Sequence, residues 1–172
     1  MIASTRFNNE TWRENSEYRN KKNYTGCIYG SPIKITSIIQ ENTILYVIEM
    51  NNSLNRIEGI GLIKNIVYCD NYYKIYSDGN YNRFIYKSKY RIDRSYLELH
   101  HSHMLHLFEL ILFKGKTHLK RGFGITRIPE KLIEHYYPII YRENSNQPPN
   151  LNPIENIQLE LNNIFSKYIN NK

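Results

Sequence analysis

Two groups of basic side chains are the residues best placed to do chemistry, and aromatic residues are interleaved with both. One group lies on and just after an expected strand over 83–92, and the other lies in the glycine-rich segment FKGKTHLKRGFG. Positive charge that follows a backbone, with aromatic faces for stacking, is typical of single-stranded nucleic-acid binding. The residues expected to contact nucleic acid are Lys87, Lys89, Arg91, Arg94, Lys114, Lys116, His118, Lys120, Arg121 and Arg127.

The spacing within each group supports this interpretation. On the expected strand Lys87, Lys89 and Arg91 alternate, so they should share one face. In the second segment, glycines would let backbone N–H groups approach a phosphate closely. The alternative is a solvated edge strand, since lysines on an edge oppose aggregation. The segment lacks the Gly-Lys-Ser/Thr ending of a nucleotide-binding loop, so nucleotide hydrolysis is not expected of it.

Four histidines lie close together in HHSHMLH, at His100, His101, His103 and His106. A helical metal site usually places two ligands four residues apart on one face. These histidines form only pairs three residues apart, and no carboxylate in the sequence is placed to complete a ligand set. We therefore expect packed and boundary histidines, with no metal and no cofactor.

Motifs of nucleophilic or nucleotide chemistry are absent from the sequence. It contains no GxSxG, no Walker A and no GxGxxG motif. Cys27 and Cys69 are isolated, which argues against a cysteine-type zinc site and against a secreted disulfide scaffold. The sequence therefore assigns no catalytic residue and gives enzyme activity no support.

The composition is that of one globular domain that favours anionic partners. The 172 residues carry a formal net charge of +7, and 41% of them are hydrophobic. A basic balance favours nucleic acid, acidic lipid or acidic protein as partner. No apolar signal segment and no run of membrane-spanning length is visible. We expect an intracellular protein without membrane contact.

The hydrophobic pattern predicts an α+β fold. It is a small five-stranded curled sheet or barrel, with a long helix after the last strand and a docked C-terminal helix. Two glycines of the third strand, Gly59 and Gly61, indicate a bulge, a barrel bend or close approach of another backbone. The expected strands span 32–39, 43–50, 56–68, 72–77 and 83–92, and the helices before the C-terminal one span 95–113 and 129–138.

The expected organisation has four parts. Residues 1–24 form a polar arm anchored by Trp12, and residues 25–141 form the α+β domain. Residues 142–152 read as a linker by composition, and residues 153–172 as an amphipathic helix.

That last helix has an apolar stripe that needs a partner surface. Its members repeat at spacings of three and four residues. The stripe can dock on its own domain, on a second copy or on another protein. It consists of Ile154, Ile157, Leu161, Ile164 and Tyr168.

The run ILYVIEMNNSLNRIEGIGLIKN, followed by YYKIYSDGNYNRFIYKSKYRIDRS, resembles PUA-like β-barrel domains, in particular the EVE and YTH branches. There a strand of the form I-x-G-x-G-x-I follows a hydrophobic strand. The resemblance covers 32–94 and implies binding of RNA or of a modified base, often in an aromatic-lined pocket. It would place Trp12, Tyr29 and Asn51 at such a pocket, although the chain lacks the multi-Trp cage of the YTH branch.

The residue bias toward Asn, Ile, Tyr and Lys, together with FKGKTHLKRGFGITRIPEKL, resembles uncharacterised proteins of giant DNA viruses. This implies a viral source, with the protein in an infected cell or a virion. The leading hypothesis is a nucleic-acid-binding module, with RNA favoured over DNA. The alternative is a non-enzymatic viral structural or protein-interaction subunit that uses the C-terminal helix and the basic surface.

Overall fold

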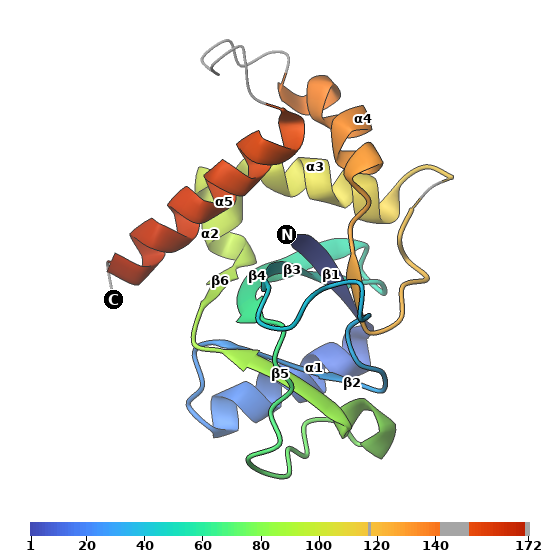
Figure 1. The fold of residues 1–172 in the computed structure, drawn as a ribbon, viewed down its shortest axis with the longest axis vertical. Helices are drawn as coiled ribbons and strands as arrows, with labels where there is room; N and C mark the ends of the chain where they lie inside the picture. Colours follow the sequence, from blue (N-terminus) through green and yellow to red (C-terminus); the bar gives the residue numbers. More distant parts are fainter. Residues whose placement is uncertain (117, 142–151, 171–172) are drawn as a thin grey trace.

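A mixed five-stranded sheet forms the centre of the computed structural model, which describes residues 1–116, 118–141 and 152–170 (Figure 1). Strand β1 runs parallel to β3, and the other neighbours are antiparallel. The sheet has edges at β6 and β7, so it is not closed into a barrel. The α+β class is confirmed. In sheet order the strands are β6 (Arg91–Asp93), β4 (Arg56–Lys64), β3 (Ile44–Asn51), β1 (Ile2–Phe7) and β7 (Ile125–Arg127).

Other elements cover both faces of this sheet. A two-stranded antiparallel sheet of β2 (Cys27–Ser31) and β5 (Phe84–Ser88) lies on one side with α1 (Asn9–Lys21). A 3₁₀ turn, η1 (Gly79–Asn82), lies beside β2. The helices on the other side are α2 (Arg94–His100), α3 (Ser102–Phe113), α4 (Glu130–Tyr141) and α5 (Pro153–Asn170) (Figure 1).

Strand β3 shows why its sequence is apolar almost throughout. Tyr46, Ile48 and Met50 pack in the core shared with the helices, whereas Leu45 and Val47 pack toward the small sheet. Successive side chains of a strand point to opposite faces, so a strand covered on both faces needs apolar residues at nearly every position. The strand expected over 43–50 is confirmed with a one-residue shift.

Glycines in β4 allow the small sheet to approach closely. A Cβ atom on Gly61 would lie 2.0 Å from the Tyr29 hydroxyl and 2.6 Å from the Cys27 sulfur. The register between β3 and β4 also shifts at Glu49 and Met50, which is a bulge. The structure therefore shows both a bulge and a close approach of another strand.

The N-terminal segment differs from the expected polar arm. Residues 2–7 form β1 inside the sheet, and α1 follows at once. Ser4 and Thr5 are buried despite their hydroxyls, because β3 and β7 pair with β1 on either side. Helix α1 is polar on most of its surface but begins with a capping box between Asn8 and Thr11. A helix stabilised by its cap and by local contacts lacks the apolar period that would predict it.

Two expected strands are loops in the structure. The segment 32–39 lies after β2, and 72–77 precedes η1. The Ile35 amide donates to the Tyr86 hydroxyl at 2.9 Å, and two consecutive amides of the second segment donate to the Asn82 side chain at 3.0 Å. Because side chains satisfy these amides, apolar residues are buried there without a strand ladder.

Three further expectations on element boundaries change. The segment 83–92 is divided into β5 and β6 by a bend at Lys89, and 95–113 is divided into α2 and α3 at His101. Pro138 lies inside α4 and does not end it. The linker prediction for 142–152 falls almost entirely outside the described residues.

The apolar stripe of α5 packs on its own domain. Ile157, Leu161 and Ile164 are 0–2% exposed and belong to the core that α3 and the sheet share. The docked C-terminal helix is therefore confirmed. Ile154 and Tyr168, the two end members of the stripe, are only half-buried, so a homodimer or protein partner that uses these ends stays a prediction.

A polar cluster fastens α5 beside the start of α3. The Glu160 carboxylate lies 3.0 Å from His101 Nδ1 and 3.1 Å from His103 Nε2, and it accepts from the Tyr141 hydroxyl at 3.0 Å. The hydrogen bond to Glu160 raises the pKa of His103. Burial opposes ionisation of Glu160, but the bonds from His103, His101 and Tyr141 hold its pKa below the ordinary value.

We expect Gly61→Ala to destabilise the fold by about 1–3 kcal/mol or more, because the new Cβ meets the tightly packed Tyr29 and Cys27. Gly79→Ala is the matched control, since a Cβ there would meet no described atom within 4 Å. Urea unfolding of both variants measures the difference. Equal stabilities would show that the small sheet does not press on β4.

The cluster at Glu160 predicts a pH-dependent contribution to stability. The stabilisation that protonated His103 provides is fully present below the ordinary histidine pKa of 6.5. It is lost as pH rises through the raised pKa of His103 in the folded protein. The Glu160 part is present above its ordinary pKa of 4.5 and is lost as pH falls through the lowered value. The contribution is therefore largest between pH 4.5 and 6.5.

This prediction is tested by measuring the free energy of unfolding between pH 4.5 and 6.5 and again well above pH 6.5. Wild type should lose more stability on the rise in pH than Glu160→Gln, whose side chain cannot pair with an imidazolium. His106→Ala is the control, because His106 lies on α3 as His103 does but is exposed. Identical pH profiles for wild type and Glu160→Gln would contradict the prediction.

Candidate nucleic-acid interface

Arg91 is a buried structural cation, not a surface contact for phosphate. It is 3% exposed, and its guanidinium bonds the Glu49 carboxylate with Nη2–Oε2 at 2.7 Å and Nε at 3.0 Å from both oxygens. It also binds Asp93 and donates to the Glu58 carbonyl at 3.1 Å. The bend at Lys89 places Arg91 on a different strand from Lys87, so the expected shared face does not form.

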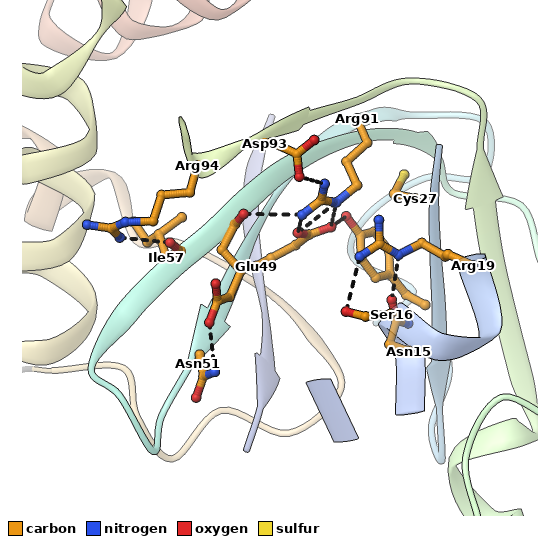
Figure 2. Close-up of polar contacts among 12 residues, drawn as sticks. Asn15, Ser16, Arg19, Cys27, Glu49, Asn51, Ile57, Arg91, Asp93 and Arg94 are labelled. Carbon is orange, nitrogen blue, oxygen red and sulfur yellow. Dashed lines mark hydrogen bonds and ion pairs between the residues drawn. The ribbon is translucent and has the colours of Figure 1, made fainter. Parts of the chain in front are cut away.

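Figure 2 shows how this pair ties the layers together. The guanidinium of Arg91 lies between Asp93 and Glu49, and Glu49 also accepts from the buried Tyr29 hydroxyl at 2.9 Å. Burial favours the neutral form of Arg91, but the carboxylates of Glu49 and Asp93 hold its pKa above the ordinary value. The pair therefore stays ionised and joins β6 to β3 and, through Tyr29, to β2.

Lys87 and Arg94 are also paired within the fold. The Arg94 guanidinium contacts Glu98 and Glu109 at 2.6 Å each and donates to the Ile57 carbonyl at 2.8 Å (Figure 2 draws the last). The Lys87 ammonium lies 3.0 Å from the Asp70 carboxylate. These cations are already paired with carboxylates, which argues against them as phosphate contacts. Lys89 differs, because it is exposed and lies 5.2 Å from the centroid of the Tyr90 ring.

The residues placed at a pocket by the family resemblance do not line one together. Tyr29 and Asn51 are 0–1% exposed, and the Asn51 amide donates to Glu58 at 2.8 Å. Trp12 packs edge-on against Phe7 at 5.2 Å between ring centroids and lies under the guanidinium of Arg19 at 5.4 Å. Trp12 therefore anchors α1, and the other two residues are core members.

The glycine-rich segment keeps its charges at the surface. Lys114, Lys116 and Arg121 are exposed, and none of them joins an ion pair among the described residues. Lys120 is half-buried and lies 5.9 Å above the Phe113 ring. Arg127 is not available in the same way, because it forms an ion pair with Glu130. His118 is half-buried, and its Nδ1 atom is buried without a hydrogen-bond partner among the described residues.

The second half of this segment is fixed against the sheet. The Lys120 carbonyl accepts from the Asn52 amide at 2.7 Å and from Arg6 at 3.4 Å. Gly124 has φ +71°, and a Cβ there would lie 2.7 Å from the Ser31 hydroxyl. Strand β7 follows and pairs with β1. The chain is thus held in one position beside the end of β1.

A cavity of about 260 Å³ lies at this place. Its walls come from the end of β1, the start of α1, the end of β2, the turn around η1 and the fixed loop. Four aromatic residues contribute, one being Phe123, which is 46% exposed. The lining is Thr5, Arg6, Phe7, Asn8, Thr11, Gly30, Pro32, Asn52, Tyr76, Tyr81, Phe123 and Gly124.

Polar groups at the cavity give it specific chemistry. Asn52 Oδ1 is buried and accepts no hydrogen bond from the described residues, so it can accept one from a ligand. Asn8 and Thr11 belong to the N-terminus of α1, which favours negative charge nearby. Arg6 is exposed and adds a cation at the rim. Aromatic walls with an acceptor and positive charge suit a planar base with its phosphate.

The sequence pattern does not predict this cavity, because the cavity is formed by turns that are far apart in the sequence. Phe7, Tyr76 and Phe123 lie in three segments that share no motif. The one local signal is the capping pattern after Phe7, which would have revealed α1 and thus the end of β1.

Buried nucleophiles do not form a second site. Burial, and then the nearby Glu49 charge, raise the pKa of the Cys27 thiol to about 12. The thiol therefore stays protonated and unreactive at neutral pH. Within the described ranges, no three His, Cys, Asp or Glu side chains are grouped so that they could hold a metal ion.

We expect Arg91→Ala to cost about 3–5 kcal/mol, because it leaves the Glu49 carboxylate buried and unpaired. The double change Glu49→Leu with Arg91→Met should recover most of that loss, since no charge is then left alone. Urea unfolding measures both. A cost below about 1 kcal/mol for Arg91→Ala, the level of an exposed pair, would contradict a structural role.

Comparison of this chain with protein-family models, with curated proteins and with solved structures finds no match. The resemblance to PUA-like domains and the viral source therefore stay predictions from the sequence. No helix in the described part of the chain is both long and apolar enough to cross a membrane.

Proposed function

We propose that this protein binds single-stranded nucleic acid, RNA in preference to DNA, and holds one base in the cavity beside the basic loop. The observation that carries the proposal is the position of the cavity. The loop with exposed Lys114, Lys116 and Arg121 continues directly into Phe123 and Gly124 of the cavity wall. A nucleotide can therefore place its base between aromatic rings while its neighbours' phosphates meet the loop.

The size and lining of the cavity support a base as the ligand. At about 260 Å³ it lies just below the usual range of about 300–1,000 Å³ for small-molecule sites, which suits a single planar group. Stacking on aromatic faces is available to every base. Asn52 Oδ1 can accept a hydrogen bond from a base, for example from the exocyclic amino group of adenine, cytosine or guanine.

The family resemblance points to the same ligand class. PUA-like proteins are the family that the β3–β4 sequence resembles, and they bind RNA or modified bases. In this chain the proposed pocket is formed by other residues than Trp12, Tyr29 and Asn51, since two of those are core residues. Three of the four cations of the strand group contribute little, because Arg91, Arg94 and Lys87 already have carboxylate partners.

A filter-binding titration with a single-stranded RNA of mixed sequence at two salt concentrations tests the proposal. Affinity should fall steeply with salt if phosphates are bound. The double change Lys116→Ala with Arg121→Ala should weaken binding and reduce the salt slope by about 0.7 for each phosphate that the variant no longer neutralises. Both side chains are exposed, so the melting temperature should not change.

The matched control is Lys64→Ala with Lys167→Ala, which removes the same charge from exposed positions elsewhere. It should bind RNA almost as wild type does. Phe123→Ala tests the base pocket and should weaken binding by about fivefold or more through loss of stacking. Absence of RNA binding at low salt, or equal losses in the loop variant and the control, would overturn the proposal.

A further inference from the structure

A second cavity lined by aromatic residues lies at the other end of α1. It has a volume of about 410 Å³. Tyr72 lines it and has 79% of its surface exposed. The lining is Tyr18, Lys22, Tyr24, Ile28, Asn71, Tyr72, Tyr73 and Lys87.

The two cavities share one face of α1. Thr11 lines the first cavity, and Tyr18 and Lys22 line the second, at spacings of seven and eleven residues that repeat on one side of a helix. Between them Asn15 closes the seam by donating to the Ile28 carbonyl at 2.7 Å and to the Tyr76 hydroxyl at 3.1 Å. The cavities are therefore two ends of one seam, roughly 16 Å apart along the helix at 1.5 Å per residue.

The charges at the second cavity favour an anionic chain over a cationic guest. Lys22 is exposed and lines the cavity. The Lys87 ammonium already lies 4.7 Å from the ring centroids of Tyr68 and Tyr73, so the cation–π positions on those rings are taken from within. Tyr72 is 79% exposed, and Lys22 forms no ion pair with the residues that the structure describes.

The seam between the cavities contains a carboxylate as well. Glu14 accepts from the Ser77 amide at 2.9 Å, which satisfies part of its charge. A nucleic-acid strand crossing here would pass with its phosphates on the side away from Glu14. Arg13 of the same helix is paired with Glu17 at 3.8 Å, so the exposed cations nearest the second cavity are Lys21 and Lys22.

We propose that the Tyr72 cavity is a second stacking subsite, which takes another base of the same single strand whose first base lies in the cavity beside the basic loop. The inference rests on the proposed function. The separation lies within the reach of a short segment, given site sizes of about 4–16 nucleotides for single-strand binding modules. The protein would then bind two bases of one strand, one in each cavity, and the nucleotides between them would span the distance along α1.

A length series of single-stranded RNA tests this, with a dinucleotide and a dodecanucleotide of the same composition. Tyr72→Ala should weaken binding of the dodecanucleotide by about fivefold or more and leave the dinucleotide unaffected. Tyr72→Phe should retain wild-type affinity, because it keeps the stacking face. Leu99→Ala is the matched control, since Leu99 is 77% exposed and lies on α2 across the sheet.

The outcomes separate this inference from the proposed function. If Phe123→Ala weakens both RNAs while Tyr72→Ala weakens neither, the second subsite is overturned and the first stands. If Tyr72→Ala weakens both lengths equally, the effect is not that of a separate subsite, and the inference is also overturned. If the wild-type protein binds neither RNA at low salt, both proposals fall together.

Discussion

The buried ion pair between Arg91 and Glu49 is the interaction on which the arrangement of layers depends. Glu49 is the member of β3 that points toward the small sheet at a position where its neighbours are apolar. A carboxylate there is tolerable only because Arg91 and the Tyr29 hydroxyl satisfy it. The pair thereby links β6 to β3 across β4 and, through Tyr29, links β2 of the small sheet to β3.

The glycines of β4 provide the space that this pair needs. A Cβ on Gly59 would lie 2.7 Å from Arg91 Nη2 and 2.9 Å from Glu49 Oε2. Two residues on, Gly61 admits Tyr29 and Cys27. The sequence GIG is therefore explained by side chains that approach from β2 and β6. It has no helix after it and serves no phosphate.

Helix α1 has two roles that follow from its position. Its inner face contacts β2 of the small sheet through Asn15 and β1 through Trp12, and its two ends border the two aromatic cavities. The basic loop adds charge next to one of these cavities. The proposed nucleic-acid surface along α1 and the loop would use side chains that the fold leaves exposed. Of the strand group that the sequence favours, Lys87, Arg91 and Arg94 are held in ion pairs.

How far the sequence predicts the structure can be seen from particular elements. The sequence predicts β3, β4 and α5, because each of them buries an apolar face with a regular period. It also predicts the turn after β3. Strand β1 and helix α1 are missed because partner strands and a cap stabilise them and their own pattern does not. The apolar segments 32–39 and 72–77 are misassigned because buried side chains do not reveal whether the backbone bonds to a strand or to Tyr86 and Asn82.

The sequence by itself determined the α+β class, the docked last helix and the positive charge of the loop after α3. These follow from periodicity and composition, which are local properties. Only the tertiary structure decided which cations are available, because pairing depends on which carboxylate lies opposite: Arg91 is buried against Glu49, while Arg121 stays exposed. It also decided which aromatic residues line one cavity, because Phe7, Tyr76 and Phe123 meet only after the chain has folded.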